Sequence, residues 1–189
     1  MKTKYPRAAA LAVAKELCDH LKPFCLPDRL KVCGSLRRKK QEVGDVEIVY
    51  FGRNEDRQEG LFDKKSFDLA EEAIGKLLSN GVLEKRLNIR GISTWGLLNK
   101  LAVHKKSGIP VDLFATTEDH WWVSVVIRTG SKEFNLRIIE SAAKNGLDLH
   151  AYGKEGFTRS STMEPVPCSS EEEVFRLAGM AWLEPDQRT

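Results

Sequence analysis

Apolar residues recur at helical spacing in several separate stretches of the chain. Near the N-terminus the stripe comprises Ala10, Val13, Ala14, Leu17, Cys18 and Leu21. Pro6 suits the start of this helix, and Lys22-Pro23 ends it. A second stripe, which Ser66 can cap and Asn80-Gly81 closes, comprises Phe67, Ala70, Ile74, Leu77 and Leu78.

Helical patterns also dominate the C-terminal third. One helix is expected after Thr116-Thr117, with Asp119 at the acidic end of a capping box. Its His120-Trp121-Trp122 cluster is expected to pack in the core, with base stacking as the alternative. A further helix is expected from about Lys132 to Asn145, and a short one, capped by Ser170, covers Val174–Ala178. Residues 147–168 are expected to be irregular, and the aromatic tail from Trp182 is expected to dock.

Between the helical stretches, apolar and β-branched runs predict strands. These are residues 29–33, 44–51, Val82–Asn88, Leu97–His104 and Ile109–Phe114, the last two forming a hairpin. The polar stretch from Gly52 to Gly60 is expected to be a mobile loop. The predicted fold class is therefore α/β (α+β): a mixed β-sheet with flanking helices to about residue 115, followed by a smaller, mainly helical module.

One segment concentrates the candidate chemistry. A small-residue turn, Gly34-Ser35, is followed by four cations from Arg37 to Lys40, and then by Gly44 and a strand carrying Asp45 and Glu47. Alternate residues of a strand share a face, so these two carboxylates lie together and favour a divalent cation between them. All-oxygen ligands favour Mg²⁺. The alternatives for each feature alone are a solvated strand face and an ordinary turn.

A third carboxylate, Asp112, lies inside the apolar run Ile109–Phe114. A carboxylate in such a strand is seldom buried unpaired, although a strand-edge position would also explain it. Beside Asp45 and Glu47 it would complete the three acids that a site for two metal ions needs.

Composition and charge narrow the class of protein. The 189 residues are 41% hydrophobic, which is enough for a core, and the net charge is only +3. The first forty positions hold far more basic than acidic residues. The basic residues are Lys2, Lys4, Arg7, Lys15, Lys22, Arg29, Lys31, Arg37, Arg38, Lys39 and Lys40, and the acidic ones are Glu16, Asp19 and Asp28. This distribution suits a polyanionic ligand. The four cysteines show no zinc-site spacing, and neither a secretion signal nor a membrane span is expected.

These motifs resemble the family X DNA polymerases, the group that includes DNA polymerase beta, over nearly the whole chain. Gly34-Ser35-Leu36-Arg37-Arg38 with Gly44-Asp45-Val46-Glu47 is similar to the nucleotidyltransferase signature of that family. Val111-Asp112 resembles its third-acid strand, and Thr129-Gly130-Ser131 its turn beside the nucleotide sugar. The segments 173–177 and 182–188 resemble the close of its thumb, which narrows the resemblance to polymerases.

The resemblance implies a palm domain over residues 1–115 and a thumb domain over 116–189. It implies that Asp45, Glu47 and Asp112 are catalytic and bind two Mg²⁺ ions, with Mn²⁺ as the alternative metal. The nucleotide-binding residues that it implies are Gly34, Ser35, Arg38, Gly44, Thr129, Gly130 and Asn135. The expected DNA-binding residues are Arg37, Lys39, Lys40, Arg128 and Lys132.

The sequence also departs from the family pattern. Glu47 stands where polymerase beta has Asp, and Ile127-Arg128 stands where it has two aromatic residues, which bears on discrimination against ribonucleotides. Val43 and Leu136 replace polar residues. The stretch before residue 30 is too short for the lyase domain, so a reduced palm-plus-thumb form, similar to small viral and phage-encoded relatives, is expected without lyase activity.

The predicted function is DNA polymerase activity: addition of a deoxynucleotide to a primer 3′-hydroxyl by two-metal catalysis, with gap-filling repair synthesis as the expected setting. The expected partners are gapped or nicked primer-template DNA and a dNTP. A cytoplasmic monomer is expected, in the nucleoid or a host cytoplasm. One alternative is a nucleotidyltransferase with an untemplated or non-DNA acceptor, such as RNA, a small molecule or a protein. Another is a non-catalytic DNA-binding module with the same fold.

Overall fold

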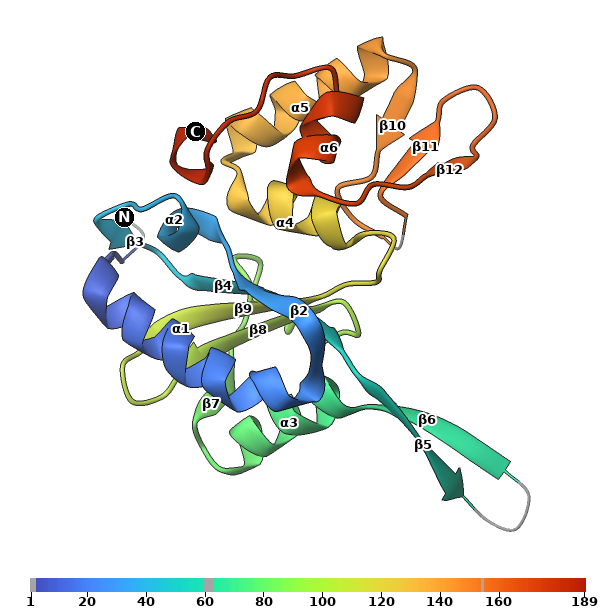
Figure 1. Ribbon diagram of the computed structural model, residues 1–189. Coiled ribbons are helices and arrows are strands. Elements are labelled where there is room, and N and C mark those ends of the chain that lie inside the picture. The colour runs from blue at the N-terminus through green and yellow to red at the C-terminus, as the bar shows by residue number, and fades with distance from the viewer. Residues whose placement is uncertain (1–2, 60–62, 154) are drawn as a thin grey trace.

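The computed structural model describes residues 3–59, 63–153 and 155–189. Its first part, through residue 115, is built around a mixed sheet (Figure 1). The elements of this part are β1 (Tyr5–Pro6), α1 (Arg7–Leu21), the 3-10 helix η1 (Lys22–Phe24), β2 (Cys25–Val32), α2 (Gly34–Arg37), β3 (Glu42–Val43), β4 (Val46–Gly52), β5 (Asn54–Glu59), β6 (Asp63–Asp68), α3 (Leu69–Ser79), β7 (Leu83–Lys85), β8 (Asn99–His104) and β9 (Ile109–Ala115).

The main sheet has the strand order β2-β4-β9-β8-β7. Its central pair, β4 and β9, runs parallel, and the other pairs are antiparallel. Helices α1 and α3 cover one face of this sheet (Figure 1). Their buried stripes, which include Leu17, Leu21 and Ile74, pack with Ile48 and Leu113 of the sheet in one hydrophobic core. The opposite face is left for the C-terminal part and for the polar side chains described below.

The C-terminal part is mainly helical, and a small sheet lies beside its helices. Its elements are α4 (Trp121–Thr129), α5 (Lys132–Lys144), β10 (Leu147–Leu149), β11 (Phe157–Arg159), β12 (Pro165–Val166), α6 (Glu171–Leu177) and the 3-10 helix η2 (Pro185–Gln187). Phe134 of α5 and Phe175 of α6 lie with their ring centroids 5.8 Å apart at the centre of this part. The predicted α+β class is therefore confirmed.

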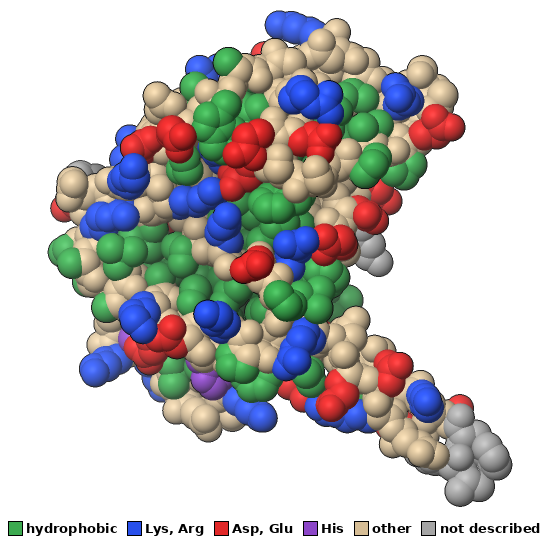
Figure 2. All heavy atoms as spheres, in the orientation of Figure 1, with side chains coloured by type: hydrophobic (Ala, Val, Ile, Leu, Met, Phe, Trp, Pro, Cys, Tyr) green, Lys and Arg blue, Asp and Glu red, His purple; other side chains and the backbone are tan. Residues whose placement is uncertain are grey.

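The predicted mobile loop at residues 52–60 is wrong for the positions that the structure describes. Strand β5 pairs antiparallel with β6, from Asn54↔Asp68 to Glu59↔Asp63, and the two form a ribbon that projects away from the molecule (Figure 1). Figure 2 shows side chains of both charges along this ribbon. Polar strands satisfy each other's backbone groups without needing a core. The predicted end of the loop, Gly60, lies outside the described residues.

The ribbon also moves the start of the second predicted helix. Ser66 and Phe67 belong to β6, and the side chain of Asp68 caps α3 by accepting hydrogen bonds from the backbone N–H groups of Ala70 (2.8 Å) and Glu71 (3.2 Å). Ser66 as the cap was therefore wrong. An Asp is as good a cap as a Ser, so the stripe alone did not decide between them.

Two other local predictions need correction. The segment 147–168 is not irregular, because it holds the antiparallel sheet β10-β11-β12. Asp119 does not close a capping box, since α4 begins at Trp121 without a side-chain cap. Core packing of the aromatic cluster is confirmed: Trp121 is fully buried. The tail docks as predicted, with the carbonyl of Arg188 accepting from the N–H of Ser131 at 2.9 Å. No helix in the described part of the chain is long and apolar enough to cross a membrane.

Candidate functional site

Parallel pairing of the two central strands brings the three predicted acids together. Glu47 of β4 lies directly opposite Asp112 of β9 in the register of the sheet, and Asp45 precedes β4 by one residue. Each carboxylate offers an oxygen atom, and these three atoms lie within 4.8 Å of one another. A short apolar stretch on each strand therefore fixes the geometry of an acidic cluster at the surface of the sheet.

The cluster is electrostatically unfavourable unless a cation joins it. Burial, together with the neighbouring charges of Asp45 and Asp112, raises the pKa of Glu47 to about 8, although Arg128 and Arg38 act to lower it. A hard divalent cation with all-oxygen ligands relieves this repulsion. The donor set therefore fits a divalent metal ion such as Mg²⁺.

Two arginines flank the acids. Arg86, which follows β7, donates from Nη2 to Oδ1 of Asp112. Arg128 of α4 stacks on Phe114, with its guanidinium carbon 3.7 Å from the ring centroid, and lies 5.1 Å from the ring centroid of Tyr152. No sequence pattern indicated the contact of Arg86 with Asp112, because the two residues lie two strands apart in the sheet and 26 positions apart in the chain.

The Gly34-Ser35 turn forms one wall of a polar cavity of about 300 Å³ beside the acids. Gly34 has φ +62°, and a Cβ there would come within 2.8 Å of Cδ of Glu47, so the position requires glycine. The buried Oγ of Ser35 and Nε of Arg38 have no hydrogen-bond partner among the described residues. Buried polar atoms without a protein partner point to a polar ligand. The lining residues are Lys4, Gly34, Ser35, Arg38, Gly44, Asp45, Glu47, Gly130, Ser131 and Lys132.

A second cavity of about 360 Å³ adjoins the first, and both contain Glu47, Gly130 and Lys132 in their walls. Asn135 reaches it from α5 and donates from Nδ2 to the carbonyl of Ile127 at 2.8 Å, while its buried Oδ1 has no partner in the part of the chain that the structure describes. A Cβ at Gly130 would overlap Phe134, so the turn approaches α5 closely. Apolar Ile127, Leu136 and Ile139 complete a wall that suits a flat, partly polar group.

The predicted DNA-binding cations divide between two environments. Lys40 is exposed, and the exposed Lys132 lies in both cavity walls. Lys39 forms an ion pair with Asp186 at 3.0 Å, and Arg37 forms one with Glu171. Arg37 therefore joins the two parts of the molecule in this structure, and its role in DNA binding stays a prediction.

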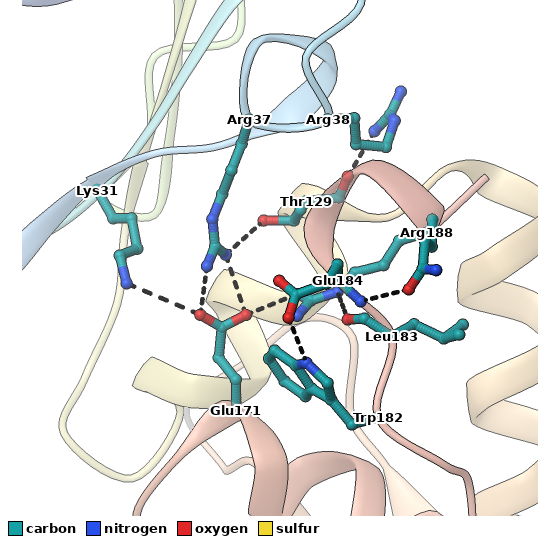
Figure 3. Close-up of polar contacts among 10 residues, drawn as sticks. Lys31, Arg37, Arg38, Thr129, Glu171, Trp182, Leu183, Glu184 and Arg188 are labelled. Atoms are coloured by element: carbon teal, nitrogen blue, oxygen red, sulfur yellow. Dashed lines mark hydrogen bonds and ion pairs between the residues drawn. The ribbon is translucent and has the colours of Figure 1, made fainter.

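Figure 3 shows the polar network that holds these two parts together. Buried Glu171 of α6 accepts hydrogen bonds from Arg37 of α2 and from Nη1 of the fully buried Arg188 at 2.6 Å, and Lys31 lies 3.7 Å away. Arg37 also donates to Oγ1 of Thr129 at 2.9 Å, and Arg38 donates to the Thr129 carbonyl. Burial alone would raise the pKa of Glu171, but the hydrogen bonds from Arg37 and Arg188 hold it below its usual range.

The comparison with known protein families accounts for most of the chain. A family model described as DNA polymerase beta palm matches residues 4–116, and one described as DNA polymerase beta thumb matches residues 124–189. The chain belongs to the DNA polymerase beta family. The family X resemblance inferred from the motifs is thereby confirmed, and the name palm applies to residues 4–116 and thumb to residues 124–189.

Membership in the DNA polymerase beta family indicates a nucleotidyltransferase. The palm match and the acidic cluster together support the use of a divalent metal. Palm and thumb matches likewise imply DNA and a nucleoside triphosphate as ligands. The network around Glu171 is then a palm–thumb contact, which the sequence did not predict because Arg37 and Glu171 are 134 positions apart along the chain.

Proposed function

We propose that this protein adds a deoxynucleotide to the 3′-hydroxyl of a DNA primer under the direction of a template. The observation that carries the proposal is the convergence of Asp45, Glu47 and Asp112 beside a polar cavity lined by Ser35, Arg38 and Lys132. Nucleotidyl transfer requires carboxylates that hold metal ions next to a site that binds the phosphate groups. The proposed domain boundary lies between residues 115 and 116, where β9 ends.

Each wall of the site has a proposed role. Gly34, Ser35, Arg38 and Gly44 would hold the triphosphate in the polar cavity. Lys132, predicted from the sequence to contact DNA, lies in the same wall. Gly130 would line the sugar pocket, and the unpaired Oδ1 of Asn135 would face the edge of the incoming base. Thr129, predicted from the sequence to line the same pocket, is fully buried and lies in the wall of neither cavity, so it would act from behind by accepting hydrogen bonds from Arg37 and Arg38. These contacts would hold the α-phosphorus where the primer oxygen could attack it in line, with pyrophosphate as the leaving group.

Asp45 and Glu47 would hold two Mg²⁺ ions, and Asp112 would hold one of them near the primer terminus. When bound, the ions lower the pKa of the primer hydroxyl and offset charge on the triphosphate. Arg38 is placed to offset charge on the departing pyrophosphate, because its Nε is buried at the cavity without a partner among the described residues.

A second candidate function is nucleotidyl transfer to an untemplated or non-DNA acceptor. The observation that favours it is Arg128, whose guanidinium lies against the rings of Phe114 and Tyr152 in the wall of the proposed nucleotide cavity. A cation in that position can contact a sugar or a phosphate that a template does not select. Primer extension on templates with each of the four bases separates the two, since only the first function follows the template.

The central test is primer extension on single-nucleotide-gapped DNA by wild-type protein and by Asp112→Asn. We expect the variant to bind the nucleotide within about threefold of wild type and to lose about a thousandfold or more in turnover, because the lost charge acts on the attacking oxygen. Asp19→Asn, on the exposed face of α1, is the matched control. Near wild-type turnover of Asp112→Asn would reject the mechanism.

The preferred DNA substrate is proposed to be gapped or nicked, and the active form to be a monomer. Binding is expected to weaken steeply with salt, because the contacts are mainly cations on phosphates. Fluorescence anisotropy with gapped, nicked and intact duplexes over a range of salt concentrations measures both points, and equal affinity for all three duplexes would contradict the preference.

A further inference from the structure

A buried histidine that the proposed mechanism does not use lies at the junction of palm and thumb. His120 immediately precedes α4, only 4% of its surface is exposed, and both nitrogens of its ring have partners. Nε2 lies 2.7 Å from the carbonyl oxygen of His150, and Nδ1 lies 2.9 Å from Oγ of Ser124. A buried ring with a partner on each side is held in one orientation.

The partners decide which ring nitrogen carries the hydrogen. A carbonyl oxygen can only accept, so Nε2 of His120 donates to His150, and Nδ1 of the neutral ring accepts from the hydroxyl of Ser124. Oγ of Ser124 can then accept from the hydroxyl of Thr116 at 3.0 Å. Burial lowers the pKa of His120 more than the hydrogen bond to His150 raises it, so the ring is neutral near pH 7.

These hydrogen bonds join the palm to the thumb. At the palm end, the backbone N–H of Thr116 donates to the carbonyl of Tyr50 in β4 at 3.0 Å. At the thumb end, His150 follows β10, and Nε2 of its own ring lies 2.8 Å from Oγ1 of Thr158 in β11. We call the side chains of Thr116, Ser124 and His120 the junction chain.

The junction chain lies directly behind a wall of the proposed nucleotide cavity. His120 and Ser124 line a cavity of about 40 Å³. The lining residues that it shares with the cavity of about 360 Å³ are Arg128, Ala151 and Tyr152. Ala151 and Tyr152 directly follow the residue whose carbonyl His120 holds. The ring of His120 therefore fixes the backbone that carries this part of the wall.

Tyr152 is the part of the wall that depends most on this backbone. Its side chain is exposed, and its ring centroid lies 5.1 Å from the guanidinium carbon of Arg128. Few atoms restrict an exposed side chain compared with one in the core. The contact with Arg128 is therefore kept mainly by the position of the chain at residues 150–152.

We propose that His120 is a positioning residue of the nucleotide pocket: through the carbonyl of His150 it holds Tyr152 against Arg128, in the wall where a nucleoside triphosphate binds. The inference rests on the proposed function for the identity of the ligand. His120 lies in the wall of neither larger cavity, so it acts through Tyr152 and not by contact with the ligand. Its loss should weaken nucleotide binding and leave Mg²⁺ binding by the acidic cluster unchanged.

A purely structural role of the ring is the alternative, because the loss of a buried hydrogen bond destabilises any protein. His104 offers a matched case. It is 3% exposed, its Nδ1 lies 2.8 Å from Oγ of Ser107, and it lies in the wall of neither nucleotide cavity. Replacement of either histidine by Phe removes a buried bond to a serine hydroxyl, but only one of the two removes the hold on His150.

The test is calorimetric titration of the whole chain with dGTP at saturating Mg²⁺, without DNA. We expect His120→Phe to weaken dGTP binding about three- to tenfold, which corresponds to the loss of one hydrogen bond. His120→Gln keeps an N–H donor for the carbonyl of His150 and should stay within about twofold. His104→Phe should leave the affinity for dGTP unchanged even if the variant melts at a lower temperature. Titration with Mg²⁺ alone should give the same result for all these proteins.

A double-mutant cycle with Tyr152→Ala separates positioning from a general loss of stability. If His120 acts through Tyr152, His120→Phe should change the dGTP affinity of Tyr152→Ala by less than about 1.5-fold. Equal losses with and without the tyrosine ring would overturn the proposal.

Two further results bear on it independently of catalysis. Unchanged dGTP affinity in His120→Phe, or an equal loss in His104→Phe, overturns the positioning role whatever primer extension shows. A loss that is coupled to Tyr152 supports the role even if the wild-type protein fails to extend primers, a result that would reject only the proposed polymerase activity.

Discussion

Glu47 is a residue of the candidate metal site whose charged form destabilises the folded, metal-free protein. It lies on a buried strand between Asp45 and Asp112, and burial together with these charges raises its pKa to about 8. The folded chain therefore keeps a proton that the unfolded chain has released across the window from about pH 4.5 to 8. The metal-free protein must lose stability as the pH rises through that window, which is the opposite of the behaviour of an ordinary ion-paired carboxylate.

Glu47→Gln removes this penalty. We expect the variant to be more stable than wild type at pH 8 in EDTA by on the order of 2–4 kcal/mol, and equally stable near pH 4, where the wild-type carboxyl is protonated in both states. Denaturant unfolding at both pH values measures the difference. Glu172→Gln, at an exposed position of α6, is the control and should show no such pH dependence.

Addition of Mg²⁺ at pH 8 should make wild type more stable than Glu47→Gln. Metal ions stabilise only the folded state that binds them, so wild type gains stability at pH 8 while Glu47→Gln gains little. If the two proteins respond equally to Mg²⁺, Glu47 is not a ligand.

For single residues, the sequence predicted the positions of those site residues whose placement depends on spacing along one strand. Asp45 and Glu47 share a strand face by simple alternation, and Asp112 joined them because parallel pairing placed it opposite Glu47. The contacts of Arg86 with Asp112 and of Arg37 with Glu171 were missed. Such contacts depend on which strands become neighbours and on how the thumb docks, and neither is encoded in the spacing of nearby residues.

Among the elements, the ribbon of β5 and β6 departs most from the pattern of its sequence. Eleven of its twelve residues are polar or charged, so it has no apolar face, and ten of the twelve are exposed. What holds it is local: Arg57 bonds Glu72 of α3 at 2.6 Å and lies over Phe67 at 5.1 Å. An isolated two-stranded ribbon is only marginally stable, and periodicity of apolar residues cannot signal it.

Shortening the ribbon tests whether it serves the site. Glu55 and Phe67 pair across it, so an Asn-Gly turn can join them in place of residues 56–66. We expect unchanged nucleotide binding and primer extension and a melting temperature within about 3 °C of wild type, because the exposed Arg57 ion pairs contribute little.

Thermal unfolding and primer extension of the shortened protein check this expectation. A folded variant that no longer extends primers would show that the ribbon contacts the DNA. In the second predicted helix, the apolar stripe was identified correctly. The helix nevertheless starts after Asp68, because the residues before it pair with strand β5.

For the whole molecule, the position of the thumb depends on one buried anion. Glu171 neutralises Arg37 of the palm and Arg188 of the C-terminal tail, and Arg38 and Lys39 add contacts to Thr129 and Asp186. Gly130 and Asn135 of the proposed nucleotide pocket lie on the thumb, whereas the acids lie on the palm. The site is therefore complete only when this network holds the two parts together.

Glu171→Gln keeps the shape of the side chain but leaves Arg37 and Arg188 without their anion. Removing one partner of a buried ion pair costs about 3–5 kcal/mol, so we expect a loss of that size in urea unfolding, against less than about 0.5 kcal/mol for the exposed Glu172→Gln. Because the thumb carries half of the pocket, nucleotide affinity should fall in the variant even at temperatures where it stays folded. Hydrogen exchange should then rise at α2 and α6, on both sides of the network, while the palm core behind α1 and α3 stays protected. Full stability of Glu171→Gln, or faster exchange confined to the tail, would mean that apolar packing and not this ion pair sets the position of the thumb.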